Sequence, residues 1–371
     1  MDHVGMDLGK RERQIAILTE DGELIHRRIR TERPRLVEVF GRWPSAKILL
    51  EASTESEWVA GCLEDLGHEV IVADPNYAPM YGQRRRRVKT DRRDAHALVY
   101  ACRAGIYRPA HRTSPERRAL RARLAVREAV VRTRAAWITG LQSLLRREGC
   151  RLRSGAPETF ITRVEELTLP PALTPVIAPL LELLGPLNHQ LEVLDQELER
   201  LVAAHEAARH LITVPGVGPV TAAAFVATVD DVTRFRNAHQ VEAYLGLIPS
   251  EWSSSETQRR GHITKAGNAR LRWLLVQGAW CILRRRKRLE TAALRDWAER
   301  IAGRRRPGHR RGSPGAAPGG DPLCDLAGWD RLRHDQSAGT ADGPPNTRTP
   351  RASASGSSPG TTASIAMGPS A

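Results

Sequence analysis

The sequence predicts an α/β domain followed by mostly α-helical segments. Short β-prone runs alternate with helical runs over residues 1–103, leucines recur at helical spacing up to residue 205, and residues 206–303 are again mostly helical. A chain of 371 residues is too long for one small domain. We therefore expect an α/β domain at 1–103, a helical coiled-coil segment at 104–205, a mostly helical domain at 206–303 and a tail at 304–371.

The first domain begins with three short strands. The β-prone runs are VGMDLG (4–9), RQIAILT (13–19) and GELIHRRI (22–29), and Asp21-Gly22 is a hairpin signal before the third. A helix (33–43), a strand (46–52), a second helix (56–66), a further strand (69–74) and a helix from near Asp91 should follow. This element order is that of the ribonuclease H-like fold.

The middle segment carries a leucine seam and a basic helix. Leu187, Leu191, Leu194, Leu198 and Leu201 are spaced by 4, 3, 4 and 3 residues, which predicts a short coiled coil starting at Pro186, either within one chain or between two. The preceding helix carries seven arginines in 18 residues. They suggest polyanion binding, with Arg121 and Arg127 as candidate contacts, although a solvated helix face would show the same pattern.

The charge balance points to the same kind of partner. Lysines and arginines number 57 against 42 acidic residues, a net charge of +15, and only five of the 57 are lysine. Arginine suits phosphate best, so nucleic acid is the expected partner, although GC-rich codon usage also inflates arginine. The five cysteines form no CxxC pair, and no apolar run is long enough to span a membrane. We expect a cytoplasmic protein with reduced thiols and no membrane contact.

Four acidic residues of the first domain stand where a two-metal site would need them. Asp7 and Glu51 follow apolar strands, and Asp91 and Asp94 lie three apart at a helix start. Two Mg²⁺ ions held by such oxygens can support phosphodiester chemistry. Each acid also has a structural alternative: Asp91 or Glu51 as a helix cap, and Asp94 as an arginine partner. Asp7-Leu8-Gly9 also suits the phosphate turn of actin-like ATPases, but a second phosphate loop is missing from the sequence.

The third domain contains two stretches that suit DNA phosphates. The segment PGVGP (215–219) lies between two helical runs and is similar to a helix-hairpin-helix turn, whose backbone at Gly216 and Gly218 would face phosphate. Downstream, polar and basic side chains surround a serine triplet at 253–255. The candidate phosphate contacts there are Arg259, Arg260, Lys265, Asn268, Arg270 and Arg272.

The acids in their local motifs, followed by VPGVGPVTA, YLGLIP, the serines and GHITKAGNARLR, resemble the DEDD transposases of insertion sequences, which are relatives of the Piv invertases. The resemblance spans residues 1 to about 303. It implies a RuvC-like domain joined by a helical coiled coil to a transposase domain, Mg²⁺, DNA, a structured guide RNA, a dimer or tetramer, and a nucleoid-associated protein. It also implies that the acids and a transposase-domain serine, which becomes joined to DNA, form one active site.

The family's serine aligns with Ser254, and Ser255 replaces the glycine that usually follows it. If that glycine has a positive φ, serine in its place would cost about 1 kcal/mol or more in conformational free energy. A polar loop at 253–255 is the alternative. The resulting prediction is a DNA recombinase of an insertion sequence. A RuvC-like junction nuclease and an inactive, nucleic-acid-binding transposase remnant are the rivals.

The tail differs in composition from the rest of the chain. Residues 304–371 hold 11 glycines and 9 prolines and few large apolar residues, which cannot form a core. We expect a disordered tail. A frameshift near residue 304 in GC-rich DNA would produce this composition, and a native nucleic-acid-binding arm is the alternative.

Overall fold

The computed structural model describes residues 1–9, 11–82, 90–253, 258–284 and 289–304. The chain forms two compact units, Met1–Leu194 and Asp195–Ala371, and each is considered by itself. The predicted tail lies almost wholly outside the described residues. None of the described helices is long and apolar enough to cross a membrane.

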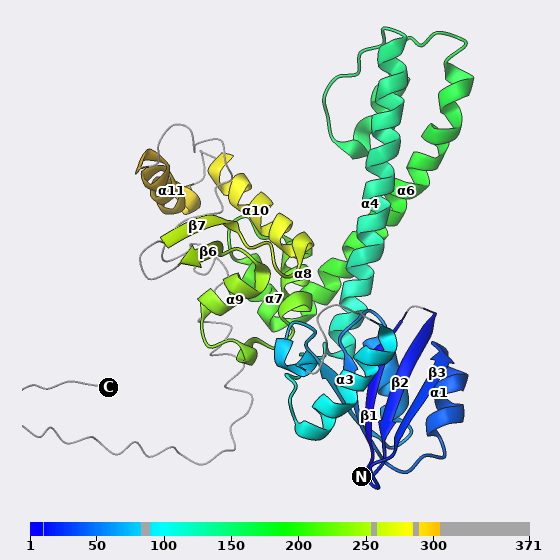
Figure 1. The fold of residues 1–371 in the computed structure, drawn as a ribbon. Helices are drawn as coiled ribbons and strands as arrows, with labels where there is room; N and C mark the ends of the chain where they lie inside the picture. Colours follow the sequence, from blue (N-terminus) through cyan, green and yellow to red (C-terminus); the bar gives the residue numbers. More distant parts are fainter. Residues whose placement is uncertain (10, 83–89, 254–257, 285–288, 305–371) are drawn as a thin grey trace, which may run out of the picture. The chain divides into compact units, whose positions relative to one another are not determined.

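The first unit contains a five-stranded sheet in the order β3-β2-β1-β4-β5 (Figure 1). Its strands are β1 (His3–Leu8), β2 (Glu12–Leu18), β3 (Leu24–Arg30), β4 (Lys47–Glu51) and β5 (Glu69–Ala73). The first three pair antiparallel, whereas β4 is parallel to both β1 and β5. This is the ribonuclease H-like topology, so the predicted fold class is confirmed.

Helices cover both faces of the sheet. Helices α1 (Arg33–Phe40) and α2 (Ser56–Glu64) pack over Val4, Met6 and Ile15 and their neighbours, while α3 (Asp91–Ala104) packs over the opposite face. Because alternate strand residues point to opposite faces, β4 needs apolar side chains on both sides. Its consecutive residues Ile48, Leu49 and Leu50 are accordingly all fully buried. A short 3₁₀ helix, η1 (Ala78–Tyr81), follows β5.

A helical hairpin completes the first unit. It consists of α4 (Pro115–Arg147), η2 (Pro157–Thr159), α5 (Phe160–Glu165) and α6 (Thr174–Ala204), which runs on into the second unit. Leu141, Phe160 and Ile177 belong to its core, and Arg134 Nη1 donates to Asn188 Oδ1 at 3.1 Å. Within the first unit, α6 therefore packs against α4 of the same chain.

The start predicted for the second long helix is wrong. Helix α6 begins at Thr174 and contains both Pro179 and Pro186, so Pro186 is interior. Proline in a helix costs one backbone hydrogen bond. Burial of Ile177 and Leu184, which precede Pro186, in the hairpin core offsets that cost.

The described part of the second unit is mostly helical, as predicted for residues 206–303. It contains α7 (Glu206–Ile212), α8 (Pro219–Val229), η3 (Val232–Arg234), α9 (Ala238–Leu245), α10 (Ala269–Arg284), η4 (Leu289–Thr291) and α11 (Ala292–Arg304). An antiparallel hairpin of β6 (Pro249–Ser253) and β7 (Gln258–Ile263) interrupts the helices. The sequence reasoning missed these strands because serine and arginine in this segment suggest a polar loop.

Candidate active site

Asp7 and Glu51 lie on neighbouring strands and on one face of the sheet. The parallel register pairs Met6 with Leu50, so Asp7 and Glu51 occupy the next position of each strand. Each shares its face with the residue two positions earlier, and those residues, Gly5 and Leu49, face α3. The expected adjacency of these two acids at the strand ends therefore agrees with the register.

Helix α3 brings the other two acids toward the same end of the sheet. A Cβ atom on Gly5 would lie 2.2 Å from the backbone nitrogen of Val99 and 2.3 Å from the carbonyl oxygen of Ala95, so the helix touches the backbone of β1. Farther along the helix, Cys102 Sγ donates to the carbonyl oxygen of Lys47, at the start of β4, at 3.4 Å. The helix thus runs antiparallel to β1 and β4, and its first turn points to the strand ends.

The first turn of α3 contains Asp91, which is exposed, and Asp94, which is 2% exposed. Thr90, not Asp91, caps the helix, since the Thr90 side chain accepts from the backbone nitrogen of Arg93 at 3.4 Å. Glu55 holds the N-cap position of α2, so Glu51 is not a helix cap either. The capping alternatives for Asp91 and Glu51 are therefore wrong.

The four acids share one face and one end of the sheet, but they are not gathered into a finished metal centre. Among the described residues, no three His, Cys, Asp or Glu side chains form a group that could hold a metal ion. Carboxylate oxygens are nevertheless the ligands that Mg²⁺ accepts, and all four side chains are carboxylates. The donor set therefore fits a hard divalent cation.

A fifth carboxylate at this edge was missed. Asp74 directly follows β5, the strand next to β4, and Arg108 Nε donates to it at 3.1 Å. Burial opposes ionisation, but donation from the backbone nitrogen of Asn76 and from Arg108 keeps the pKa of Asp74 below its usual value. The run EVIVAD could have revealed it as a strand-end acid. Its guanidinium partner gives it a structural role.

The predicted nucleophile, Ser254, lies outside the described residues, as does Ser255. The preceding residue, Ser253, ends β6 and donates through Oγ to Glu251 Oε1 at 2.6 Å. Trp252 is 69% exposed and pairs across the hairpin with Arg259. The serine segment thus follows a strand that presents a tryptophan to solvent.

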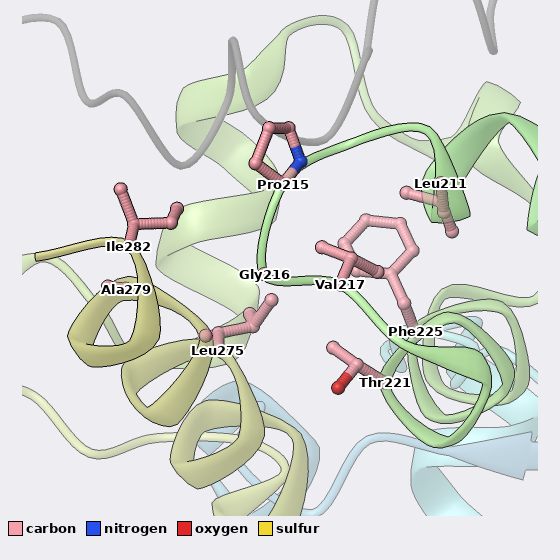
Figure 2. Close-up of a pocket in the computed structure, with 10 residues that line it drawn as sticks. Leu211, Pro215, Gly216, Val217, Thr221, Phe225, Leu275, Ala279 and Ile282 are labelled. Atoms are coloured by element: carbon pink, nitrogen blue, oxygen red, sulfur yellow. The ribbon is translucent and has the colours of Figure 1, made fainter. Parts of the chain in front are cut away.

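The glycine turn between α7 and α8 is packed against α10. Gly216 has φ +85°, and a Cβ on it would lie 2.7 Å from the carbonyl oxygen of Gly278. Figure 2 shows the turn beside α10, with Val217, Phe225 and Leu275 lining a small apolar pocket of about 20 Å³. This packing accounts for glycine at 216 without a phosphate, and assignment of the turn as a helix-hairpin-helix motif stays a prediction.

Two of the predicted phosphate contacts hold the fold of the second unit together. Asn268 Oδ1 accepts from the backbone nitrogen of Leu271 at 2.9 Å and so caps α10. Arg272 Nη1 donates to the carbonyl oxygens of Leu245 and Ala266, each at 2.8 Å. Arg259 and Lys265 are exposed, and the side chain of Arg260 lies outside the described set.

The basic face of α4 also makes intrachain pairs. Arg118 bonds Glu57 at 3.0 Å, Arg132 bonds Glu128 at 2.9 Å, and Arg134 bonds Glu158 at 2.8 Å. Carboxylates of the chain thus neutralise part of the positive charge that suggested polyanion binding. Arg121 and Arg127 are half-buried on the same helix, and their role in binding stays a prediction.

Comparison with known proteins identifies the family. A model described as DEDD transposase of the IS110 type matches residues 4–148, and the model of the transposase IS116/IS110/IS902 family matches residues 208–293. A probable family 20 transposase of Pseudomonas aeruginosa is 31% identical over 296 residues, which cover 76% of this chain and 85% of that protein. The chain belongs to the IS116/IS110/IS902 transposase family.

A second relative covers a similar share of the chain. The transposase of insertion sequence element IS1328 from Yersinia enterocolitica is 27% identical, over 79% of this chain and 87% of the relative. Among solved structures, T. thermophilus RuvC in complex with a Holliday junction substrate aligns over 30% of this chain and 100% of the RuvC chain. The sequence identity is 15% and the TM-score is 0.22. The ribonuclease H-like fold of the transposase rests on its strand order and on the family match.

Membership in the family makes this protein a DNA transposase and sets aside the actin-like ATPase alternative. The matched segments divide between the two units: residues 4–148 carry the four acids, and residues 208–293 carry the glycine turn, the β6–β7 hairpin and α10. The resemblance inferred from the motifs is thus confirmed.

Proposed function

We propose that this transposase cleaves and rejoins DNA strands with divalent metal bound by Asp7, Glu51, Asp91 and Asp94. The observation that supports the proposal is the antiparallel packing of α3 on β1 and β4, which directs all four acids to one end and face of the sheet. Mg²⁺ bound there would stabilise the charge that develops on the phosphate and the leaving oxygen. Asp91 is exposed, whereas Asp7 and Glu51 are half-buried and Asp94 is buried.

The chain's own residues fix the position of this site. Gly5 lets α3 approach the backbone of β1. The Thr90 cap defines where α3 starts, and Asp91 and Asp94 therefore lie in its first turn. The carboxylates of the site and the phosphates of DNA are both anions, so the acids require a bound cation before a DNA phosphate can approach. We infer that the free site repels DNA and that metal loading reverses this repulsion.

Ser254 is the proposed nucleophile, and its oxygen becomes joined to a DNA phosphate as the 3′ or 5′ oxygen of the cut strand leaves. The proposal rests on the alignment of the serine run with the family and on the basic residues that follow it. A structured guide RNA and a dimer or tetramer are part of the same proposal and rest on the family resemblance alone.

A strand-transfer assay with end-labelled DNA tests the proposal. With Mg²⁺, the wild-type protein should form a covalent protein–DNA species that Ser254→Ala lacks and that Ser253→Ala, the matched control, retains. Cleavage without an adduct would favour a junction nuclease that uses water. DNA binding without cleavage would favour an inactive remnant. Sequencing the nucleic acid that copurifies with the protein tests the guide RNA separately.

A further inference from the structure

Helix α10 presents two different faces. On one, Leu271, Leu274 and Ile282 are at most 9% exposed, and Gly278 packs against the glycine turn. The opposite face carries an Arg/Trp stripe, which we define as Arg270, Trp273, Gln277, Trp280 and Arg284. Spacings of three and four residues place these side chains on one side of a helix.

The tryptophans of the stripe are open to solvent although they are large. Trp273 is 50% exposed and Trp280 is 37% exposed, whereas a fold would normally bury such rings. Each is paired with a guanidinium: Arg270 Cζ lies 4.4 Å from the ring centroid of Trp273, and Arg284 Cζ lies 5.5 Å from that of Trp280. The cation–π contacts hold both rings on the helix surface and leave ring area available.

The charge of the helix selects the kind of partner. The sixteen residues of α10 include three arginines and no Asp or Glu, so its field attracts an anion. Aromatic rings that alternate with guanidinium groups suit a strand with bases to stack and phosphates to pair. An aliphatic protein surface would match the rings but would not complement the positive charge of the helix.

We propose that the Arg/Trp stripe of α10 binds single-stranded DNA by stacking unpaired bases on Trp273 and Trp280. Unpaired DNA bases arise when a transposase cuts and rejoins strands, which favours DNA as the ligand of the stripe. Arg270 and Arg284 contact the phosphates that flank the stacked bases. The inference rests on the transposase activity and not on the proposed metal ligands or nucleophile.

Fluorescence anisotropy of the full-length protein tests the stripe. The probe is a labelled single-stranded DNA 20-mer of mixed sequence, titrated in EDTA so that neither metal nor cleavage contributes. Trp273→Ala and Trp280→Ala should each weaken binding about fivefold to a hundredfold, the range found for loss of one stacked base. Phenylalanine at either position should retain binding within a few-fold, and Gln277→Ala, on the same face without a ring, should change little.

Binding of duplex DNA, binding of RNA and the oligomeric state of the variants serve as controls. Duplex DNA of the same sequence, whose bases are already stacked, should be bound equally by wild type and the alanine variants. Equal loss for duplex and single strand, unchanged single-strand binding, or a selective loss for RNA of the same sequence would each overturn the proposal. So would a change of oligomeric state in Trp273→Ala with DNA binding intact, since the stripe would then be a protein interface. Circular dichroism of each variant establishes that α10 remains folded.

Discussion

The backbones of Gly216 and Gly278 lie in direct contact, and each blocks a side chain on the other. A Cβ on Gly216 would be 2.7 Å from the carbonyl oxygen of Gly278, and one on Gly278 would be 2.9 Å from that of Gly216. The turn between α7 and α8 is thereby fixed to the middle of α10. This contact sets which face of α10 is buried and hence which face exposes the tryptophans.

Gly216→Ala should lower the stability of the second unit by about 2 kcal/mol or more. The substitution combines strain at φ +85°, which costs about 1–2 kcal/mol for an L residue, with the clash against Gly278. Thermal unfolding followed by circular dichroism measures the effect. Gly218→Ala is the matched control, since φ is −101° there and no atom lies within 4 Å of the added Cβ. Equal stability losses in the two variants would contradict this assignment.

Gly5→Ala should displace α3 from the sheet and reduce DNA cleavage together with stability. A methyl group on β1 has no room beside Val99 and Ala95, and moving the helix also moves Asp94. Gly61→Ala, in α2, is the control, because open space surrounds it and alanine favours a helix by about 1 kcal/mol over glycine. A Gly5→Ala protein with normal melting temperature and cleavage would show that α3 does not touch β1.

Replacing Asp7, Glu51 or Asp94 should strongly reduce metal-dependent DNA cleavage. Asp7→Asn, Glu51→Gln and Asp94→Asn should each reduce cleavage by about a hundredfold or more, because an amide loses the charge that holds the cation. Titration with Mn²⁺ in a calorimeter should show weaker binding in the same variants. Asp74→Asn, which removes the carboxylate paired with Arg108, should cleave DNA within a few-fold of wild type. Full cleavage by two of the first three would refute the metal site.

Arg13→Met should leave the melting temperature unchanged or raise it. Arg13 is 1% exposed, and among the described residues its Nε and Nη2 atoms have no acceptor, while Nη1 reaches only Met6 Sδ at 3.9 Å. Two unsatisfied donors cost about 1–3 kcal/mol each, more than the contact with Trp58 returns. Thermal melts of Arg13→Met and of the exposed control Arg11→Met measure this. A large loss in Arg13→Met alone would mean that the guanidinium has an acceptor in the folded protein.

The same residue gives a pH dependence. Burial lowers the pKa of Arg13 from its ordinary value to about 10, with Glu55 partly opposing the shift. Between these values the unfolded chain holds the proton more tightly than the folded one, so stability of the wild type should rise with pH relative to Arg13→Met. Urea unfolding of both proteins at pH 9 and pH 11 compares the two slopes.

The sequence alone determined the order of the elements in the first unit and the identity of its acids. Periodicity is a local property, and the runs AKILLEA (46–52) and EVIVAD (69–74) are predicted to be strands because they are short, apolar on both faces and alternate with helices. The motifs around Asp7, Glu51, Asp94 and Ser254 also sufficed to recognise the family. None of this required knowledge of which elements touch.

Only the tertiary structure decided the roles that depend on contacts between distant residues. Asn268 and Arg272 resemble phosphate ligands in sequence, yet they cap α10 and bond backbone carbonyls, while Asp74 has Arg108, 34 residues away, as its partner. Pro186 suggested a helix start because the packing of Ile177 and Leu184 is invisible in the sequence. A side chain's hydrogen-bond partners, and the face that a helix buries, are set by packing energies summed over the whole unit, which no local pattern contains.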